Sequence, residues 1–179
     1  MANCTTFNSI LKDCNNNQGG IFSVWIANQS DVTYTVVTTA HTITAITTAS
    51  TATQAFTPFE FRRNIGKSDA AAKIDLVNGS IVYEVNTDLE FTRREASKSR
   101  AITILGEGQR FLDIIYLDAN GKYWLVEGAQ LNKSDEATGV KRSDGSKYTV
   151  GFLAEMDHKP YEILASAITG GLLGTGSGL

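Results

Sequence analysis

The feature that most constrains the fold is a run of alternating residues from position 81 to position 92. The odd positions of this run are Ile81, Tyr83, Val85, Thr87, Leu89 and Phe91. The even positions carry mostly polar side chains. Because successive side chains of a strand point to opposite faces, the pattern predicts a strand with one buried face and one wet face. At about 3.3 Å per residue, such a strand would extend over roughly 30 Å or more.

A turn signal lies directly before this strand. Asn78-Gly79 follows the apolar-rich segment 74–77. Asn-Gly readily supplies the positive φ angles of a tight hairpin turn. We therefore predict a hairpin over residues 73–92, with one long arm.

The rest of the chain also favours strands. We expect a short helix over residues 95–107, capped by Ser97 or Ser99, with Ala101 and Leu105 on its buried face. We expect a charged loop over residues 132–146. The expected further strands cover residues 21–26, 32–37, 111–117, 122–126, 147–155 and 161–164. The predicted fold class is mainly β: an antiparallel β-sandwich or barrel with one short helix and extended arms.

The length of 179 residues indicates one core. We predict an N-terminal arm over residues 1–20, a β domain over residues 21–164, and a flexible Gly-rich tail over residues 165–179. Cys4 and Cys14 are either two free thiols or a disulfide, and the sequence leaves both open.

Residues 38–57 stand apart in composition, since they are rich in Thr, Ala and Ile and carry no Asp, Glu, Lys or Arg. A segment without charge gains little from facing water. We expect it to be an extended arm that docks on a neighbouring subunit, with Thr39, Ile43, Ile46 and Phe56 as contacts. The alternative is an ordinary exposed β-ribbon.

The residue types that usually carry chemistry form no catalytic or metal-binding motif in this sequence. His41 and His158 lie far apart in sequence and away from both cysteines, so the spacing of a usual zinc site is absent. Gly66-Lys67-Ser68 resembles the end of a phosphate-binding loop, but Phe61 stands where that loop requires glycine. We predict no enzymatic activity, no catalytic residues, no cofactor and no metal.

The overall charge and hydropathy exclude two classes of partner. The formal net charge is -3 and the pI about 5.4, so the basic footprint of a nucleic-acid-binding domain is missing. No apolar stretch approaches the roughly 20 residues that a membrane helix needs. We expect no membrane association.

The segment from Arg100 to Leu125, and above all Asp118-Ala119-Asn120-Gly121-Lys122-Tyr123-Trp124, resembles tail tube proteins and related virion structural proteins of Bacteroidetes-type phages. The resemblance covers about residues 73–164. It implies a virion protein, present in the host cytoplasm during assembly, whose copies form stacked, hexameric rings around a DNA channel. Its partners would be itself and other virion proteins. The alternatives are a neck, ring or head-associated virion protein, or a β-sandwich that binds carbohydrate or a cell surface.

The resemblance also suggests a role for the wet face of the long strand. In a closed ring of long hairpins, Glu84, Asp88 and Glu90 would face the lumen. Like charge repels DNA phosphates over about one Debye length, roughly 8 Å at physiological salt. We therefore predict an acidic lumen through which DNA passes without adhering.

Overall fold

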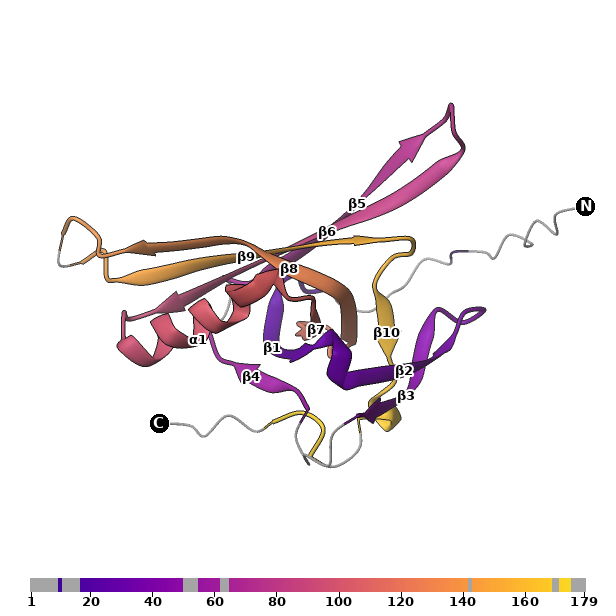
Figure 1. Ribbon diagram of the computed structural model, residues 1–179, viewed down its shortest axis with the longest axis horizontal. Helices are drawn as coiled ribbons and strands as arrows, with labels where there is room; N and C mark the ends of the chain where they lie inside the picture. The colour runs from indigo at the N-terminus through magenta and orange to yellow at the C-terminus, as the bar shows by residue number, and fades with distance from the viewer. Residues whose placement is uncertain are drawn as a thin grey trace, which may run out of the picture.

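The computed structural model describes residue 10 and residues 17–49, 55–61, 65–141, 143–168 and 171–174. Within these ranges the protein is mainly β with one α-helix, which confirms the predicted fold class (Figure 1). The strands are β1 (Ile21–Asn28), β2 (Val32–Val37), β3 (Thr42–Thr48), β4 (Thr57–Phe59), β5 (Lys67–Asp75), β6 (Ser80–Thr92), β7 (Leu112–Asp118), β8 (Tyr123–Ala137), β9 (Lys147–Met156) and β10 (Tyr161–Ile163). The helices are α1 (Ala96–Gly106) and the short 3-10 helices η1 (Gln29–Asp31), η2 (Glu107–Gln109) and η3 (Ala165–Ala167).

Strand β8 belongs to two sheets. The first, here called the broad sheet, has the order β2-β3-β10-β8-β7-β1-β4. The second, here called the long sheet, has the order β5-β6-β9-β8 and uses the second half of β8, from Gln130 to Ala137. All pairings are antiparallel except that of β3 with β10, which is parallel.

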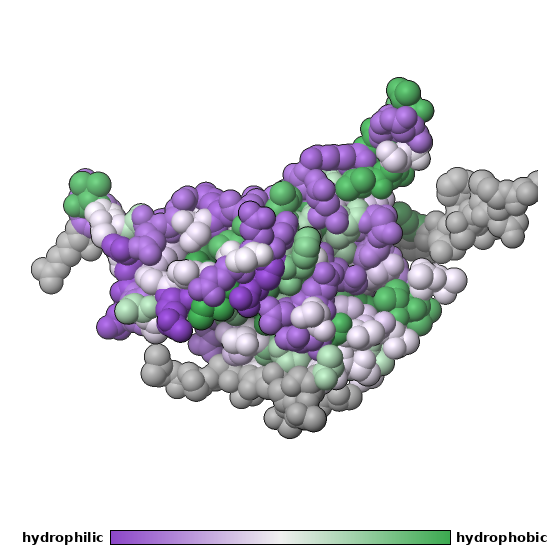
Figure 2. Space-filling model, viewed as in Figure 1, coloured by the Kyte–Doolittle hydropathy of each residue, from purple (hydrophilic) through white to green (hydrophobic). Residues whose placement is uncertain are grey.

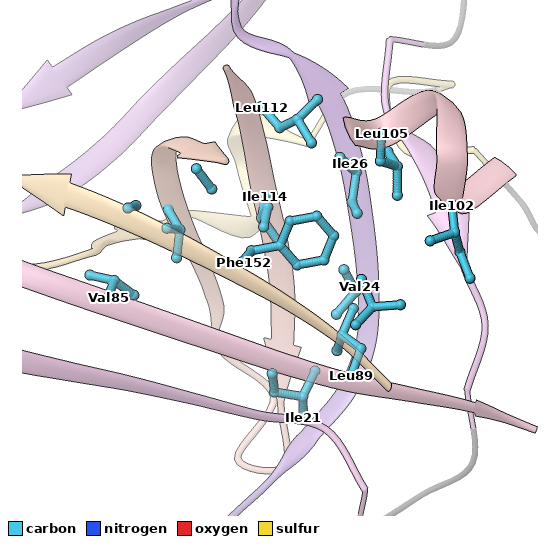
Figure 3. Close-up of a cluster of buried hydrophobic side chains, with 14 of the residues drawn as sticks. Ile21, Val24, Ile26, Val85, Leu89, Ile102, Leu105, Leu112, Ile114 and Phe152 are labelled. Carbon is cyan, nitrogen blue, oxygen red and sulfur yellow. The ribbon is translucent and has the colours of Figure 1, made fainter. Parts of the chain in front are cut away.

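The two sheets and α1 enclose the main core. Val85 and Leu89 of β6 point toward Ile114 of β7 and Val24 of β1 (Figure 3). Together with Phe91 of β6 they belong to one buried cluster, and all five residues are at most 6% exposed. These β6 residues are the odd-numbered members of the alternating run. The predicted inward face of β6 is therefore confirmed over this part of the strand.

Helix α1 packs on the core side of the long sheet, but not as predicted. Its buried residues are Ile102 and Leu105, whereas Ala101 is exposed. The residue at its N-cap is Glu95, which makes no side-chain capping bond. The buried Tyr148 hydroxyl instead accepts the Glu95 N–H at 3.1 Å and lies 2.7 Å from Ser99 Oγ. The β-branched Ile102 is tolerated because it fills the core.

A second core lies on the opposite face of the broad sheet. It contains Ile43 and Ile46 of β3, Phe56, Ile115 and Leu125. Ile43 and Phe56 are 0% exposed and Ile46 is 8% exposed. The expectation that these three side chains dock on a neighbouring subunit is therefore wrong. They are covered by their own chain, since β3 pairs with β2 and β10 in the broad sheet. Thr39 is exposed in the β2–β3 turn, and its role as a contact stays a prediction.

Two further predictions need correction. The expected loop 132–146 is a strand as far as Ala137, because β8 and β9 form a long hairpin in which Glu136 lies opposite Tyr148. The expected flexible tail is packed in its first part, where Ala167 and Leu172 are buried in the second core. Most of the predicted arm 1–20, including Cys4 and Cys14, lies outside the described residues, as do residues 175–179.

Candidate assembly surface

The outer face of the long sheet, which points away from the core, brings together the three carboxylates singled out in the sequence. Glu84, Asp88 and Glu90 lie on alternate residues of β6, opposite in direction to the buried Val85 and Leu89. The strand register adds side chains of β5, β9 and β8 to the same face. Whether this face lines a channel stays a prediction.

Each of the three carboxylates has a lysine partner from a neighbouring strand. Lys73 forms an ion pair with Glu84. Lys67 Nζ lies 3.4 Å from Asp88 Oδ2, and Lys147 Nζ lies 2.8 Å from Glu90 Oε2. The face is therefore a ladder of cross-strand ion pairs.

These contacts stabilise the charged forms of the groups. The hydrogen bond from Lys73 is the main reason why the pKa of Glu84 lies below its usual value. The same bond raises the pKa of Lys73, and hydrogen bonds to Asp69 and then Asp88 raise the pKa of Lys67. Glu84, Lys73 and Lys67 are therefore held in their charged forms at neutral pH.

The ion pairs make the outer face of the long sheet less acidic than predicted. Seven carboxylates of the described strands share the outer face with four lysines, so the lysines offset more than half of the negative charge. The carboxylates are Asp69, Asp75, Glu84, Asp88, Glu90, Asp135 and Glu155, and the lysines are Lys67, Lys73, Lys133 and Lys147. The face predicted to be acidic is therefore only mildly acidic, and the three carboxylates singled out in the sequence are ion-paired.

The pairing of Lys67 with Asp88 was not predicted, although the sequence of the hairpin indicates it. Counting back from the turn after Asp75, a regular hairpin places Lys67 directly opposite Asp88, as the structure does. Opposite charges on facing residues stabilise a hairpin by up to about 1 kcal/mol. Lys147 could not have been assigned in this way, because β9 joins β6 from a distant part of the sequence.

The long sheet ends in two strands without a second neighbour among the described residues. Strand β5 pairs only with β6, and the second half of β8 pairs only with β9 in this sheet. Each edge presents a row of backbone N–H and C=O groups that another strand could pair with. These edges lie on opposite sides of the sheet, with β6 and β9 between them.

A second candidate site is a hollow of about 610 Å³ beside β1 and β4. Its walls include the aromatic residues Phe22, Trp25, Phe59, Phe61 and Tyr123. Several of these rings already serve the fold. Trp25 Nε1 donates to Gly174 O at 3.0 Å, and the Phe59 ring lies 6.2 Å from that of Phe91.

Asp113, a buried carboxylic acid on β7, is held by hydrogen bonds within the fold. Asp113 is 0% exposed and accepts hydrogen bonds from the Tyr34 hydroxyl at 2.7 Å and from the Gly128 N–H at 3.0 Å. Burial raises the pKa of Asp113, and these two bonds partly oppose that rise. This contact fixes β2, which carries Tyr34, to the centre of the broad sheet.

The two histidines are far apart in the sequence but close together in the structure. The rings of His41 and His158 both pack against Tyr161, with centroids 4.4 Å and 4.1 Å from the tyrosine ring, and lie 6.3 Å from each other. Within the described ranges, no three His, Cys, Asp or Glu side chains are grouped so that they could hold a metal ion.

Comparison with protein-family models gives no match, and comparison with curated proteins gives none either. None of the helices in the described part of the chain is long and apolar enough to cross a membrane.

Proposed function

We propose that the protein is a virion structural protein, a tail tube subunit whose copies assemble into stacked rings that form a conduit for DNA. The observation that carries the proposal is the long sheet. It has four antiparallel strands, two open edges and one wet, ion-paired face. The resemblance of Arg100 to Leu125 to tail tube proteins supports the same assignment.

The strand number favours ring closure. Since β5, β6, β9 and β8 alternate in direction, β5 and β8 run oppositely. A second copy related by rotation would therefore place its β5 antiparallel to the β8 edge of the first. Such a head-to-tail contact forms a ring when the rotation closes. The wet face would then line the lumen, and the core side of every long sheet would stay covered by its own broad sheet.

The dimensions suit the proposed cargo. Six copies, the number that the resemblance implies, would close a barrel of roughly 24 strands. With about 4.8 Å between strands and a tilt of about 40°, its backbone diameter would be roughly 50 Å. After the side chains are placed, the lumen would still admit one DNA duplex. A mildly acidic wall would not hold the phosphates.

Electron microscopy of the purified protein, with light scattering over a range of concentrations, tests the proposal. We expect rings or stacked tubes with a central hole. Single rings that do not stack would favour a neck or head-associated virion protein instead. A monomer at every concentration would rule out both.

A pair of proline variants tests the edge contact. Neighbouring residues of an edge strand turn their N–H groups alternately inward and outward. Between Ala70→Pro and Ala71→Pro, one variant should break the β5–β6 ladder, and the other should keep the fold but block assembly. Rings formed by the folded variant would contradict pairing through β5.

An alternative function is carbohydrate binding in the hollow beside β1 and β4, which is lined by aromatic residues. Sugars stack on accessible aromatic rings. Five aromatic rings line this hollow, of which Phe22 is exposed and the other four are half-buried. A glycan array with the wild-type protein and with Tyr123→Ala would test it. Binding that is lost in the variant would favour this function, provided that no rings form.

A further inference from the structure

One end of the long sheet continues as a two-stranded ribbon. The pairing of β9 with β6 stops at Met156, opposite Tyr83, whereas β5 and β6 continue to Asp75 and Ser80. Figure 1 shows this hairpin standing out from the body of the protein. Isolated two-stranded ribbons are at best marginally stable in water, so the ribbon gains from any surface that covers it.

The end of this ribbon is apolar. Leu76 and Val77 in the turn are 90% and 92% exposed, and the facing residues Ile74 and Ile81 are 60% and 48% exposed. Figure 2 shows hydrophobic residues gathered at the tip of this hairpin. These residues form one contiguous apolar end, which is typical of a contact surface.

The turn is held in shape before any contact forms. Asp75 Oδ1 accepts the N–H groups of Val77 and Asn78 at 2.9 Å and 3.1 Å, and Gly79 supplies the positive φ of +67°. The Asn78 contacts also lower the pKa of Asp75, so the carboxylate stays charged. A preformed tip loses little conformational freedom on docking.

A hollow lies at the other edge of the long sheet, where β8 bends from one sheet into the other. Its volume is about 550 Å³. Gly128, with a φ of +66°, lies at the bend. The apolar part of the lining comes from Leu105, Phe111, Leu131 and Leu153, and the Phe111 side chain is 56% exposed.

The two features lie at the same end of the sheet. The ribbon extends from the end where β5 finishes and β6 begins, and this is also the end where β8 enters the long sheet, beside Leu131. If a neighbour's β5 pairs with the β8 edge, its ribbon continues past Leu131 and reaches the bend. The ribbon of the same chain cannot do so, because β6 and β9 separate it from β8 by roughly 14 Å.

We infer that the apolar ribbon end of one copy docks in the hollow at the β8 bend of the next copy in the ring. This inference rests on the proposed function and specifies its partner surface: a second copy of this chain, contacted through residues 74–82. Leu76 and Val77 would fill the hollow against Phe111 and Leu131. The contact would set the register of the strand pairing between neighbours.

Cysteine cross-linking tests this contact in a background where Cys4 and Cys14 are serine. Val77→Cys protein is mixed with Phe111→Cys protein under mild oxidation. We expect a disulfide-linked dimer of the two different variants, because the proposed contact joins unlike surfaces. The control replaces Val77→Cys by Val140→Cys, an equally exposed apolar residue near the tip of the β8–β9 hairpin.

A second variant measures the strength of the contact. Leu76→Ser with Val77→Ser should leave the monomer folded and raise the midpoint concentration for assembly at least about tenfold. Rings that form normally in this variant, with no excess of the Val77–Phe111 cross-link over the Val140 control, would overturn the inference and leave the proposed function standing. Absence of rings in the wild-type protein would overturn both.

Discussion

Two apolar segments of this protein have opposite surroundings. The uncharged segment 38–57 supplies Ile43 and Phe56, both fully buried in the second core. The ribbon end supplies Leu76 and Val77, both almost fully exposed. The sequence predicted that the first segment reaches outward, and it assigned Leu76 and Val77 only to a hairpin over residues 73–92.

The difference shows what an apolar pattern determines. Both segments carry side chains that are more stable out of water. Segment 38–57 is covered because β3 pairs with β2 and with β10, a strand more than 100 residues further along the chain. The ribbon extends past the end of β9, so nothing in its own chain covers it within the described residues. An apolar pattern predicts that side chains are buried, but it does not show whether they are buried by their own chain or by a second copy.

The largest expected effect is a difference in the free energy of unfolding between a variant of segment 38–57 and a variant of the ribbon end. Phe56→Ala should lower the free energy of unfolding by about 3–5 kcal/mol, because it leaves a cavity in the second core. The matched change Leu76→Ala should alter it by less than about 0.5 kcal/mol in dilute protein. Chemical denaturation measures both. Similar losses in the two variants would mean that the segments do not differ as described.

A smaller effect concerns the contact that holds β2 on the core. Tyr34→Phe removes the hydroxyl that donates to the buried Asp113 and should cost about 1.5–3 kcal/mol of unfolding free energy. Tyr123→Phe on β8 is the control, since the Tyr123 hydroxyl makes no hydrogen bond within the described residues, and we expect little change. Equal stability of the two variants would argue against an anchoring role for Tyr34.

The same carboxyl predicts a pH dependence. Burial raises the pKa of folded Asp113 above its unfolded value, so the folded state keeps a proton that the unfolded state releases. Its contribution to stability therefore falls as the pH rises from the ordinary aspartate value, 3.8, through the folded pKa. Asp113→Asn should gain stability relative to wild type across that window, by about 1.4 kcal/mol per unit of pKa difference. A stability difference that is constant with pH would contradict this.

The smallest effect on stability is expected on the outer face. Replacing Glu84, Asp88 and Glu90 with lysine breaks surface ion pairs that contribute at most about 1 kcal/mol each. The fold should remain, but assembled tubes should retain DNA in a sedimentation assay. A control variant with Glu60, Glu107 and Asp157 replaced by lysine carries the same charge change away from this face. Equal DNA retention by both variants would remove the argument for a lumen.

Several parts of the fold were predictable because their signals are local. The alternation of residues 81–92 and the turn at Asn78-Gly79 identified the β5–β6 hairpin, and the helix near residues 95–107 was also found. The strand continuation from Asn132 to Ala137 was missed, since those polar residues are a strand only because β9 pairs with them. The exposure of the ribbon was missed for the same reason, because it depends on where β9 ends. Local composition does not predict which strands pair when they lie far apart in the sequence.

Hydrogen–deuterium exchange tests the central claim most directly, by comparing the protein in dilute and in assembled form. The claim is that the edge strand β5 and the ribbon are covered by a second copy, whereas β3 is covered by its own chain. We predict that the amides of residues 67–82 gain protection on assembly, and that those of residues 42–48 are protected equally in both forms. Protection gained over residues 42–48 while residues 67–82 exchange freely would contradict the account.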